Sequence, residues 1–342
     1  MLKAVIALIL LLPVVAWADE KTSECKLPAN TDFSVRNYYS KSTTFTETDP
    51  LCDGKGAGLI CRQYGLLYLP RSVVKRPAVI INHGRDEDRK AKAEFCATVE
   101  YFLNRGFVVF VPRRRGIDSD LHPHANTGIN FDDTLDAVMH GRIPAEAAQL
   151  KKDCHLKEDK KKLDDATHRC VLTQLARGET LELRAAINWL RALRHPDDGF
   201  KTYVDSKKIL LLGHSRGAII SLYAGIDLPD YFLPALVIAL DASEKGWKNS
   251  GWGLMDAIDK VKVPVMLFQP GNAVSVDSTK ELATRLAAAR KPFLAEKLPN
   301  VPLEDPSNPQ KGVHNGIFMR ADQVARWGPL ALTYMKLYDV VK

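Results

Sequence analysis

The segment 208–218 constrains the fold of this chain more than any other stretch. It contains four branched apolar residues, then Gly213-His-Ser-Arg-Gly217, then the start of a helix-compatible run. We expect a buried strand, a sharp turn and a helix in immediate succession. The backbone must bend so tightly at Ser215 that a side chain on either flanking glycine would clash. Such a turn lifts the serine hydroxyl above the edge of a sheet and points the next helix N-terminus toward it.

Short apolar runs alternate with helix-like stretches along most of the chain. The runs are uniformly apolar, as in strands covered on both faces, and span residues 77–82, 107–111, 234–240 and 263–268. Amphipathic stripes predict helices over about 95–103 and 180–193 and from 321 onward. Ser278-x-x-Glu281 resembles a capping box that opens a further helix. Strands and helices in this order predict a mostly parallel sheet with helices on both faces.

Residues 113–178 interrupt this alternation with a long, polar and charged stretch that carries helix-like pieces around 132–139 and 145–175. An insertion of this length inside a compact α/β domain is usually a functional lid or subdomain. We therefore expect one domain over residues 19–342, of which 19–50 are an extended lead-in, with a lid-like insertion at about 113–178. No stretch has the composition of a linker that would divide the chain.

Residues 1–18 resemble a secretory signal peptide. Lys3 gives a positive start, an apolar run follows, and Ala16-Trp17-Ala18 is a small-x-small cleavage pattern. We expect cleavage before Asp19 and export to the periplasm or the medium, with a retained anchor as the alternative. No later segment is long and apolar enough to cross a membrane.

The chain contains six cysteines and no Cys-x-x-Cys motif. An even number in an exported protein favours disulfides over metal or redox chemistry. Short separations favour the pairs Cys52–Cys61 and Cys154–Cys170, which would leave Cys25 and Cys96 as the third pair.

The net charge of +7 does not indicate a nucleic-acid-binding protein. Basic clusters occur at 113–115 and 160–162, but no basic stripe is interleaved with aromatic residues. His122 and His124 lack a third ligand at a useful spacing, so no metal site is predicted.

The serine at a strand-to-helix elbow, the alternating strands and helices and the late His314-Asn-Gly316 resemble the α/β-hydrolase fold over roughly residues 60–340. Within that fold the chain is most similar to dienelactone-hydrolase-like esterases. Around the strand that ends in Asp241, it resembles platelet-activating-factor acetylhydrolases.

Within this resemblance, Ser215 has the position of the nucleophile and His314 that of the base. A serine hydroxyl needs an adjacent base to accept its proton. In this fold the histidine follows the serine along the chain, and His314 is the single histidine downstream of the elbow. It is expected in a loop, although Asn315 stands between it and Gly316 where the family has His-Gly. His214, inside the elbow, is expected to pack or to line the oxyanion side.

The position of the acid departs from the commoner family pattern. Most relatives place an aspartate in the loop after the penultimate strand, where this chain has Gly-Asn-Ala-Val at 271–274. Asp241 instead ends the preceding predicted strand, and Leu-Asp-Ala there resembles the acid position of the acetylhydrolases. We therefore expect Asp241 to orient and stabilise the imidazole, with Asp277 and Asn272 as the other candidates.

The resemblance also implies an oxyanion hole made of the backbone N–H of Arg216 and one from Gly84 or Arg85. The implied protein is an exported serine hydrolase that cleaves small-molecule carboxylic esters through an acyl-enzyme, without a metal or an organic cofactor. A serine peptidase of the prolyl-oligopeptidase type and a non-catalytic binding protein that keeps the fold are the alternatives.

Overall fold

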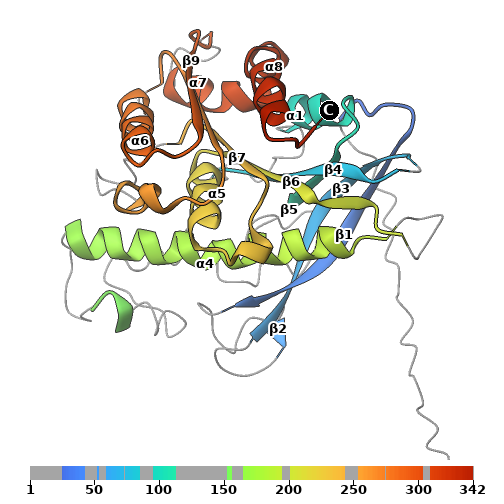
Figure 1. Cartoon of the computed structure of the whole chain (residues 1–342), viewed down its shortest axis with the longest axis horizontal. Helices are drawn as coiled ribbons and strands as arrows, with labels where there is room; N and C mark the ends of the chain where they lie inside the picture. The colour runs from blue at the N-terminus through green and yellow to red at the C-terminus, as the bar shows by residue number, and fades with distance from the viewer. Residues whose placement is uncertain are drawn as a thin grey trace, which may run out of the picture.

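The computed structural model describes residues 25–42, 52–53, 59–72, 74–84, 95–112, 152–155, 165–194, 201–242, 253–273, 275–302 and 309–341. Within these residues one mixed sheet lies between two layers of helices (Figure 1). This arrangement confirms the predicted α/β class and the mostly parallel sheet.

The described strands form a single sheet in the order β1-β3-β5-β4-β6-β7-β8-β9, with β2 beside β3. From β5 to β9 in this order the neighbours run parallel, whereas β1, β2 and β3 add an antiparallel edge. The strands are β1 Thr31–Ser42, β2 Cys52–Asp53, β3 Leu59–Pro70, β4 Arg76–Asn82, β5 Val108–Pro112, β6 Val204–His214, β7 Leu236–Leu240, β8 Val265–Pro270 and β9 Phe293–Leu298.

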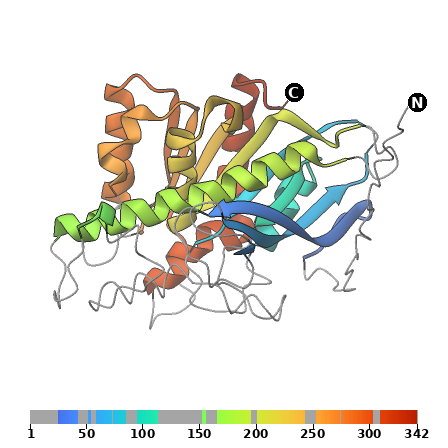
Figure 2. The ribbon, with the colours of Figure 1, turned by 90° about the horizontal axis from the view of Figure 1, so that it is seen from below.

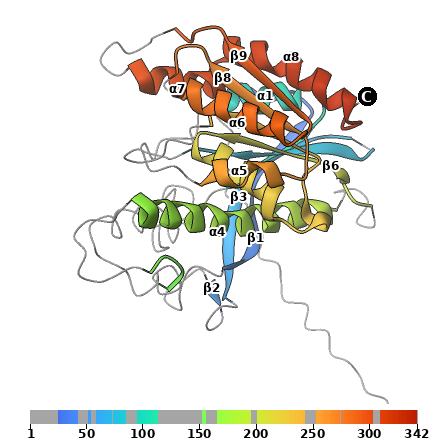
Figure 3. The same cartoon turned by 60° about the vertical axis from the view of Figure 1, so that its left-hand side comes forward.

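Helices cover both faces of the sheet. Helices α1, α7 and α8 pack on one face, and α4, α5 and α6 pack on the other (Figure 3). The described helices are α1 Cys96–Leu103, α4 Asp165–Ala192, α5 Arg216–Asp227, α6 Val276–Ala288, α7 Pro309–Met319 and α8 Ala321–Leu337, with short 3₁₀ turns η4 Asp230–Phe232, η6 Leu254–Asp256 and η7 Ile258–Lys260.

The uniformly apolar strands are explained by these two helical layers. In β4, Ala78 and Ile80 join the core under α4 and α5, whereas Val79 and Ile81 join the core under α1 and α8. All four side chains are fully buried. Successive side chains of a strand point to opposite faces, so both faces must be apolar when both are covered.

Helix α4 corrects the sequence-based boundary at 178. We expected the insertion to end there and a separate helix to follow over 180–193, but α4 is one helix of 28 residues (Figure 2). Its apolar stripe is continuous, since Leu172, Ala176, Leu183 and Ile187 are all buried in the same core. The cost of about 1 kcal/mol for a glycine inside a helix does not break it at Gly178. Residues 113–151 and 156–164 lie outside the described residues, so the lid stays a prediction.

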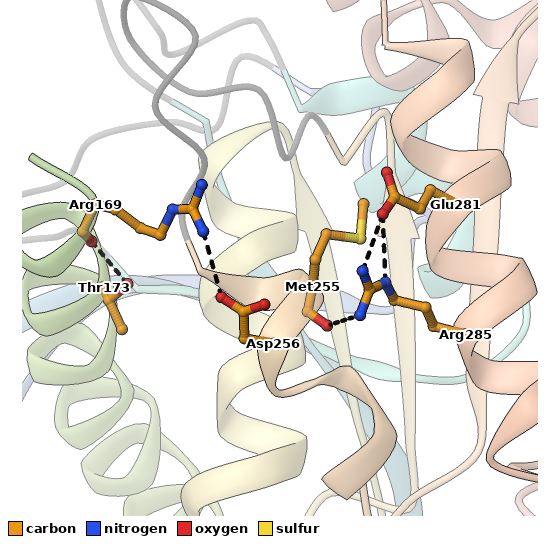
Figure 4. A network of polar contacts seen from close by, with 6 residues as sticks. All are labelled: Arg169, Thr173, Met255, Asp256, Glu281 and Arg285. Atoms are coloured by element: carbon orange, nitrogen blue, oxygen red, sulfur yellow. Dashed lines mark hydrogen bonds and ion pairs between the residues drawn. The ribbon is translucent and has the colours of Figure 1, made fainter. Parts of the chain in front are cut away.

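The segment around η6 links α4 to α6 at the surface (Figure 4). Arg169 of α4 lies 3.5 Å from the carboxylate of Asp256, and Arg285 of α6 donates to the backbone oxygen of Met255 at 2.9 Å. Arg285 also pairs with Glu281 one turn earlier. These charged groups are largely exposed, so each ion pair contributes at most about 1 kcal/mol to the stability of the fold.

Two of the three predicted disulfides are confirmed. Cys25 is bonded to Cys96 at the start of α1, and Cys154 is bonded to Cys170 in α4. The backbone of Cys52 lies opposite that of Cys61 in the β2–β3 pair, but this third bond lies outside the described side chains and stays a prediction.

The disulfides are consistent with an oxidising compartment. The signal peptide at 1–18 lies outside the described residues. Among the helices that the structure describes, none is long and apolar enough to span a bilayer.

The two disulfides should stabilise the fold to different extents. Cys25 and Cys96 are separated by 71 residues, and Cys154 and Cys170 by 16. A crosslink that closes a longer loop removes more entropy from the unfolded chain. We therefore expect the free energy of unfolding to fall by about 4 kcal/mol in Cys25→Ser/Cys96→Ser and by about 3 kcal/mol in Cys154→Ser/Cys170→Ser. Urea unfolding of the two double variants measures both losses. Equal stability of the first double variant and the wild type would contradict this expectation.

Candidate active site

Ser215 alone connects β6 to α5, as the sequence predicts. Its backbone lies at φ 55° and ψ −125°, a left-handed conformation that costs about 1–3 kcal/mol in a non-glycine residue. Its N–H donates to the Leu240 carbonyl at 3.0 Å, and its carbonyl accepts from Ala218 at 2.9 Å. The hydroxyl makes no capping bond to α5, although serine is a preferred capping residue. The side chain therefore lies at the end of the strand and does not cap the helix.

The flanking glycines are required by close backbone contacts. A Cβ on Gly213 would lie 2.3 Å from the carbonyl oxygen of Gly217, and a Cβ on Gly217 would lie 2.0 Å from that of Asn82. Asn82 also donates its side-chain amide to the Gly217 carbonyl at 3.1 Å. The first turn of α5 thus packs directly on the end of β4, which confirms the predicted reason for both glycines.

The segment after β4 lies against the elbow. A Cβ on Gly84 would be 3.1 Å from the Cβ of Ser215 and 3.2 Å from Nδ1 of His214. His83 before it is buried, and its Nδ1 lies 2.9 Å from the Gly84 carbonyl. Gly84 therefore lies beside Ser215, which Arg216 follows directly along the chain, whereas Arg85 lies outside the described residues.

Asp241 follows β7 at the same edge of the sheet. Leu240 pairs with His214 in the β6–β7 register, so Asp241 and Ser215 leave adjacent parallel strands. Asp241 has φ 49° and is 1% exposed, and its N–H donates to the Phe268 carbonyl at 2.9 Å. Its Oδ2 lies 2.5 Å from Nδ1 of His314. The structure therefore brings together the predicted acid and the predicted base.

His314 lies on helix α7 and not in a loop, which corrects the sequence-based expectation. The segment contains Gly312 and Gly316, both poor helix formers. The helix nevertheless buries Val313 and Ile317, which are four residues apart and so share one face. Packing of this face overrides the low helix propensity. The His314 side chain remains 34% exposed.

The second carboxylate oxygen of Asp241 is bound by two side chains from the end of β8 and the segment after it. Gln269 Nε2 donates to Oδ1 at 2.5 Å, and the Ser275 hydroxyl donates to the same oxygen. Gln269 also donates to Ser275 at 2.7 Å and accepts from Thr279 at 2.5 Å. Sequence reasoning missed this network, although Gln269 gave a signal as a polar residue closing an apolar strand.

This network keeps Asp241 ionised. Burial on its own would raise the pKa of the Asp241 carboxyl. Hydrogen bonding to His314, the charge of His314 and the hydrogen bonds from Ser275 and Gln269 outweigh burial and hold the pKa of Asp241 below its usual value. The buried carboxylate is therefore charged at neutral and mildly acidic pH.

The other two acid candidates have different contacts. The Asn272 side chain bonds to both backbone groups of Val301, each at 3.0 Å. Asp277 is exposed in the first turn of α6. The predicted capping box at Ser278 is wrong because α6 begins at Val276, and the Ser275 hydroxyl at its N-cap position binds Asp241.

Solved structures share this architecture. Esterase B from Lactobacillus rhamnosis matches at 15% identity and a TM-score of 0.52, covering 93% of this chain and 89% of that one. An inhibited form of the enzyme matches at 14% identity and a TM-score of 0.51, covering 92% and 90%. Porphyromonas gingivalis dipeptidyl peptidase 4 matches at 13% identity and a TM-score of 0.48, covering 90% of this chain and 35% of that one.

The two esterase matches cover more than nine-tenths of this chain, and its described elements form a mostly parallel sheet with helices on both faces. The chain has the α/β-hydrolase fold. No protein-family model and no curated protein sequence matches it. The esterase similarity therefore shows the fold of this chain, and its chemistry must be inferred from its own residues.

Ser215 and His314 are the more accessible residues of this candidate site. Both are partly exposed, whereas Asp241 and His214 are buried. The His214 and His314 rings are 4.6 Å apart, centroid to centroid, which brings α7 beside the elbow. Within the described residues, the Ser215 hydroxyl and the His314 imidazole are not hydrogen-bonded to each other. Catalytic hydrogen bonds are often long before a substrate binds and tighten in the complex.

Arg216 adds an ion pair that sequence reasoning missed. Its guanidinium pairs with Glu179 of α4, and the two side chains are 4% and 9% exposed. A charged residue on an amphipathic helix normally faces water, so no pattern in the sequence marks Glu179. This pair links α4 to the residue after the candidate nucleophile. Among the described residues, no cluster of three or more acidic, histidine or cysteine side chains could hold a metal ion.

The close packing at the elbow should make Gly217 much less tolerant of substitution than Gly225 on the same helix. In Gly217→Ala the new methyl would meet the backbone of Asn82 at 2.0 Å, and backbone cannot move aside cheaply. We expect the free energy of unfolding to fall by more than about 3 kcal/mol, as in severe overpacking. In the matched Gly225→Ala variant the nearest atom is a Val263 methyl at 3.0 Å, and the gain of about 1 kcal/mol in helix propensity offsets the contact. Thermal melting of both variants measures the difference, and equal melting temperatures would contradict it.

Proposed function

We propose that this protein is an exported serine hydrolase that cleaves small-molecule carboxylic esters. Ser215 is the nucleophile, His314 is the general base and acid, and Asp241 orients the imidazole. The observation that carries the proposal is the 2.5 Å contact between His314 and a buried, ionised Asp241, one strand away from a serine held in a left-handed turn. The predicted signal peptide and the two disulfides support export.

The Asp241–His314 contact fixes which imidazole nitrogen can act as the base. A carboxylate oxygen accepts only, so Nδ1 of His314 carries the hydrogen in this bond. In the neutral ring Nε2 is then the acceptor, and it takes the proton from the Ser215 hydroxyl. The buried negative charge of Asp241 also stabilises the imidazolium that forms.

Two covalent steps complete the reaction. The Ser215 oxygen attacks the ester carbonyl carbon, and the tetrahedral intermediate collapses as the imidazolium gives its proton to the departing alkoxide. An acyl-enzyme and an alcohol result. Water then attacks the acyl carbon while His314 accepts one of its protons, and return of this proton to Ser215 releases the carboxylic acid. The backbone N–H of Arg216 and that of Gly84 or Arg85 stabilise the oxyanion in both steps.

Covalent labelling tests the proposed nucleophile. A fluorophosphonate probe should label the wild-type protein on Ser215, and Ser215→Ala should abolish labelling because the attacking oxygen is gone. Ser221→Ala is the matched control, since Ser221 is buried in the same helix and should not change labelling. Equal labelling of Ser215→Ala and the wild type, or no labelling of a folded wild type, would refute the proposal.

Hydrolysis of a p-nitrophenyl ester should exceed that of the matching p-nitroanilide, whereas the reverse would favour a peptidase.

Asp241→Asn should lower kcat by about 10³- to 10⁴-fold, through the tautomer of His314. Ser275 and Gln269 both donate to Oδ1, so they hold the amide with its oxygen toward them and its NH₂ toward His314. Nδ1 must then accept, which places the hydrogen on Nε2 and removes the base. Asp277→Asn is the control and should keep full activity, because Asp277 is exposed on α6. Ester turnover, with circular dichroism as a check of folding, measures the effect; full turnover by Asp241→Asn would exclude Asp241 as the acid.

A further inference from the structure

Three buried side chains from three different elements donate to backbone carbonyls of α7. Thr98 of α1 donates to the Phe318 carbonyl at 2.7 Å, and the Trp327 indole of α8 donates to that of Ile317 at 2.9 Å. Nε2 of His214, the last residue of β6, lies 2.8 Å from the His314 carbonyl. A carbonyl oxygen only accepts, so Nε2 of His214 carries the hydrogen.

Two of these bonds are explained by the end of the helix. The last four carbonyls of a helix have no partner within it, and those of Ile317 and Phe318 belong to this set because α7 ends at Met319. The His314 carbonyl lies one turn earlier, where the helix itself supplies a partner. The bond from His214 therefore does not serve helix termination and needs another explanation.

The position of His214 suggests what this bond does. It precedes Ser215 directly, and its ring stacks on Phe318 with the ring planes 7° apart and the centroids at 5.1 Å. The ring is 4% exposed. Burial, together with the nearby charge of His314, lowers the pKa of His214 to about 3, although Asp241 and the bond to the His314 carbonyl act in the opposite direction. The ring is thus a neutral, rigid link between the residue before the serine and the backbone of His314.

We propose that His214 is a positioning residue that sets the separation of Ser215 and His314. The inference rests on the proposed serine-hydrolase function. Asp241 fixes the rotation of the His314 ring, and the His214 hydrogen bond fixes the backbone that carries the ring. Without this bond, α7 would keep its C-terminal anchors at Thr98 and Trp327, but the turn that holds His314 could shift relative to the elbow.

Substitutions at His214 separate the hydrogen bond from packing. In His214→Phe the ring can still stack on Phe318, but the donor is lost. In His214→Gln the stacking is lost, but the amide nitrogen can take the place of Nε2 as donor to the His314 carbonyl. In His214→Asn the amide is too short to reach that carbonyl. Tyr203→Phe is the control, because Tyr203 is also buried and donates to a backbone carbonyl, that of Pro70, at the other end of β6.

Steady-state ester hydrolysis and fluorophosphonate labelling rates of these four variants test the inference. We expect His214→Phe and His214→Asn to lower kcat by about 10- to 100-fold with little change in KM, the size of effect that follows a misplacement of about 1 Å. His214→Gln should recover kcat to within about fivefold of the wild type, and Tyr203→Phe should leave it unchanged. The variants should also slow probe labelling in the same order.

The outcomes distinguish this inference from the function on which it rests. A wild type that neither turns over esters nor reacts with the probe would overturn both. A reactive wild type with a folded His214→Phe variant of unchanged kcat would overturn the role of His214 alone. Equal loss in His214→Gln and His214→Asn at equal melting temperature would do the same, and this comparison stands even where the phenylalanine variant does not fold.

Discussion

The contact between the first turn of α5 and the end of β4 governs the geometry of the whole site. The helix approaches so closely that backbone meets backbone at Gly217 and Asn82. One residue is then left to turn the chain from strand to helix, and Ser215 takes a left-handed conformation to do so. Strain of this kind persists only where the surroundings fix it, as the bond from the Ser215 N–H to β7 does here. The position of the serine is therefore a property of the packed sheet and not of the turn alone.

The same edge of the sheet explains why a buried carboxylate can lie after β7, whereas the loop after β8 carries no acidic residue. Asp241 is buried, and a buried carboxylate is tolerated only where its charge is paired and hydrogen-bonded. β8 ends beside β7, and its residue Gln269 donates to the oxygen that His314 does not contact, as does Ser275 before α6. The residues at the end of β8 and after it thus stabilise the Asp241 carboxylate and supply no carboxylate themselves. The Ser275 hydroxyl, for example, binds Asp241 and does not cap α6.

The sequence predicted the features that depend on local pattern or on complete burial. The inner strands were recognisable because residues such as Val79 and Ile80 must be apolar on both faces, and the elbow because its glycines meet backbone. Features that depend on distant partners were not recognisable. β9 carries charged residues and completes the sheet only by pairing with β8, and α7 is helical despite two glycines because its apolar face is buried. The candidate roles of Ser215 and His314 could be predicted from their order along the chain. The roles of Gln269, Ser275 and Glu179 depend on contacts with residues that are distant in the sequence.

Burial sets the protonation state of His214, whose ring lies beside that of His314. Their rings are 4.6 Å apart, and two imidazolium charges at that separation would repel each other. His214 is enclosed between Phe318 and the elbow, so its charged form is disfavoured. His314 is one-third exposed and contacts the Asp241 carboxylate. A neutral His214 keeps its single hydrogen on Nε2, so it can hold the bond to the His314 carbonyl without a change in its own protonation state.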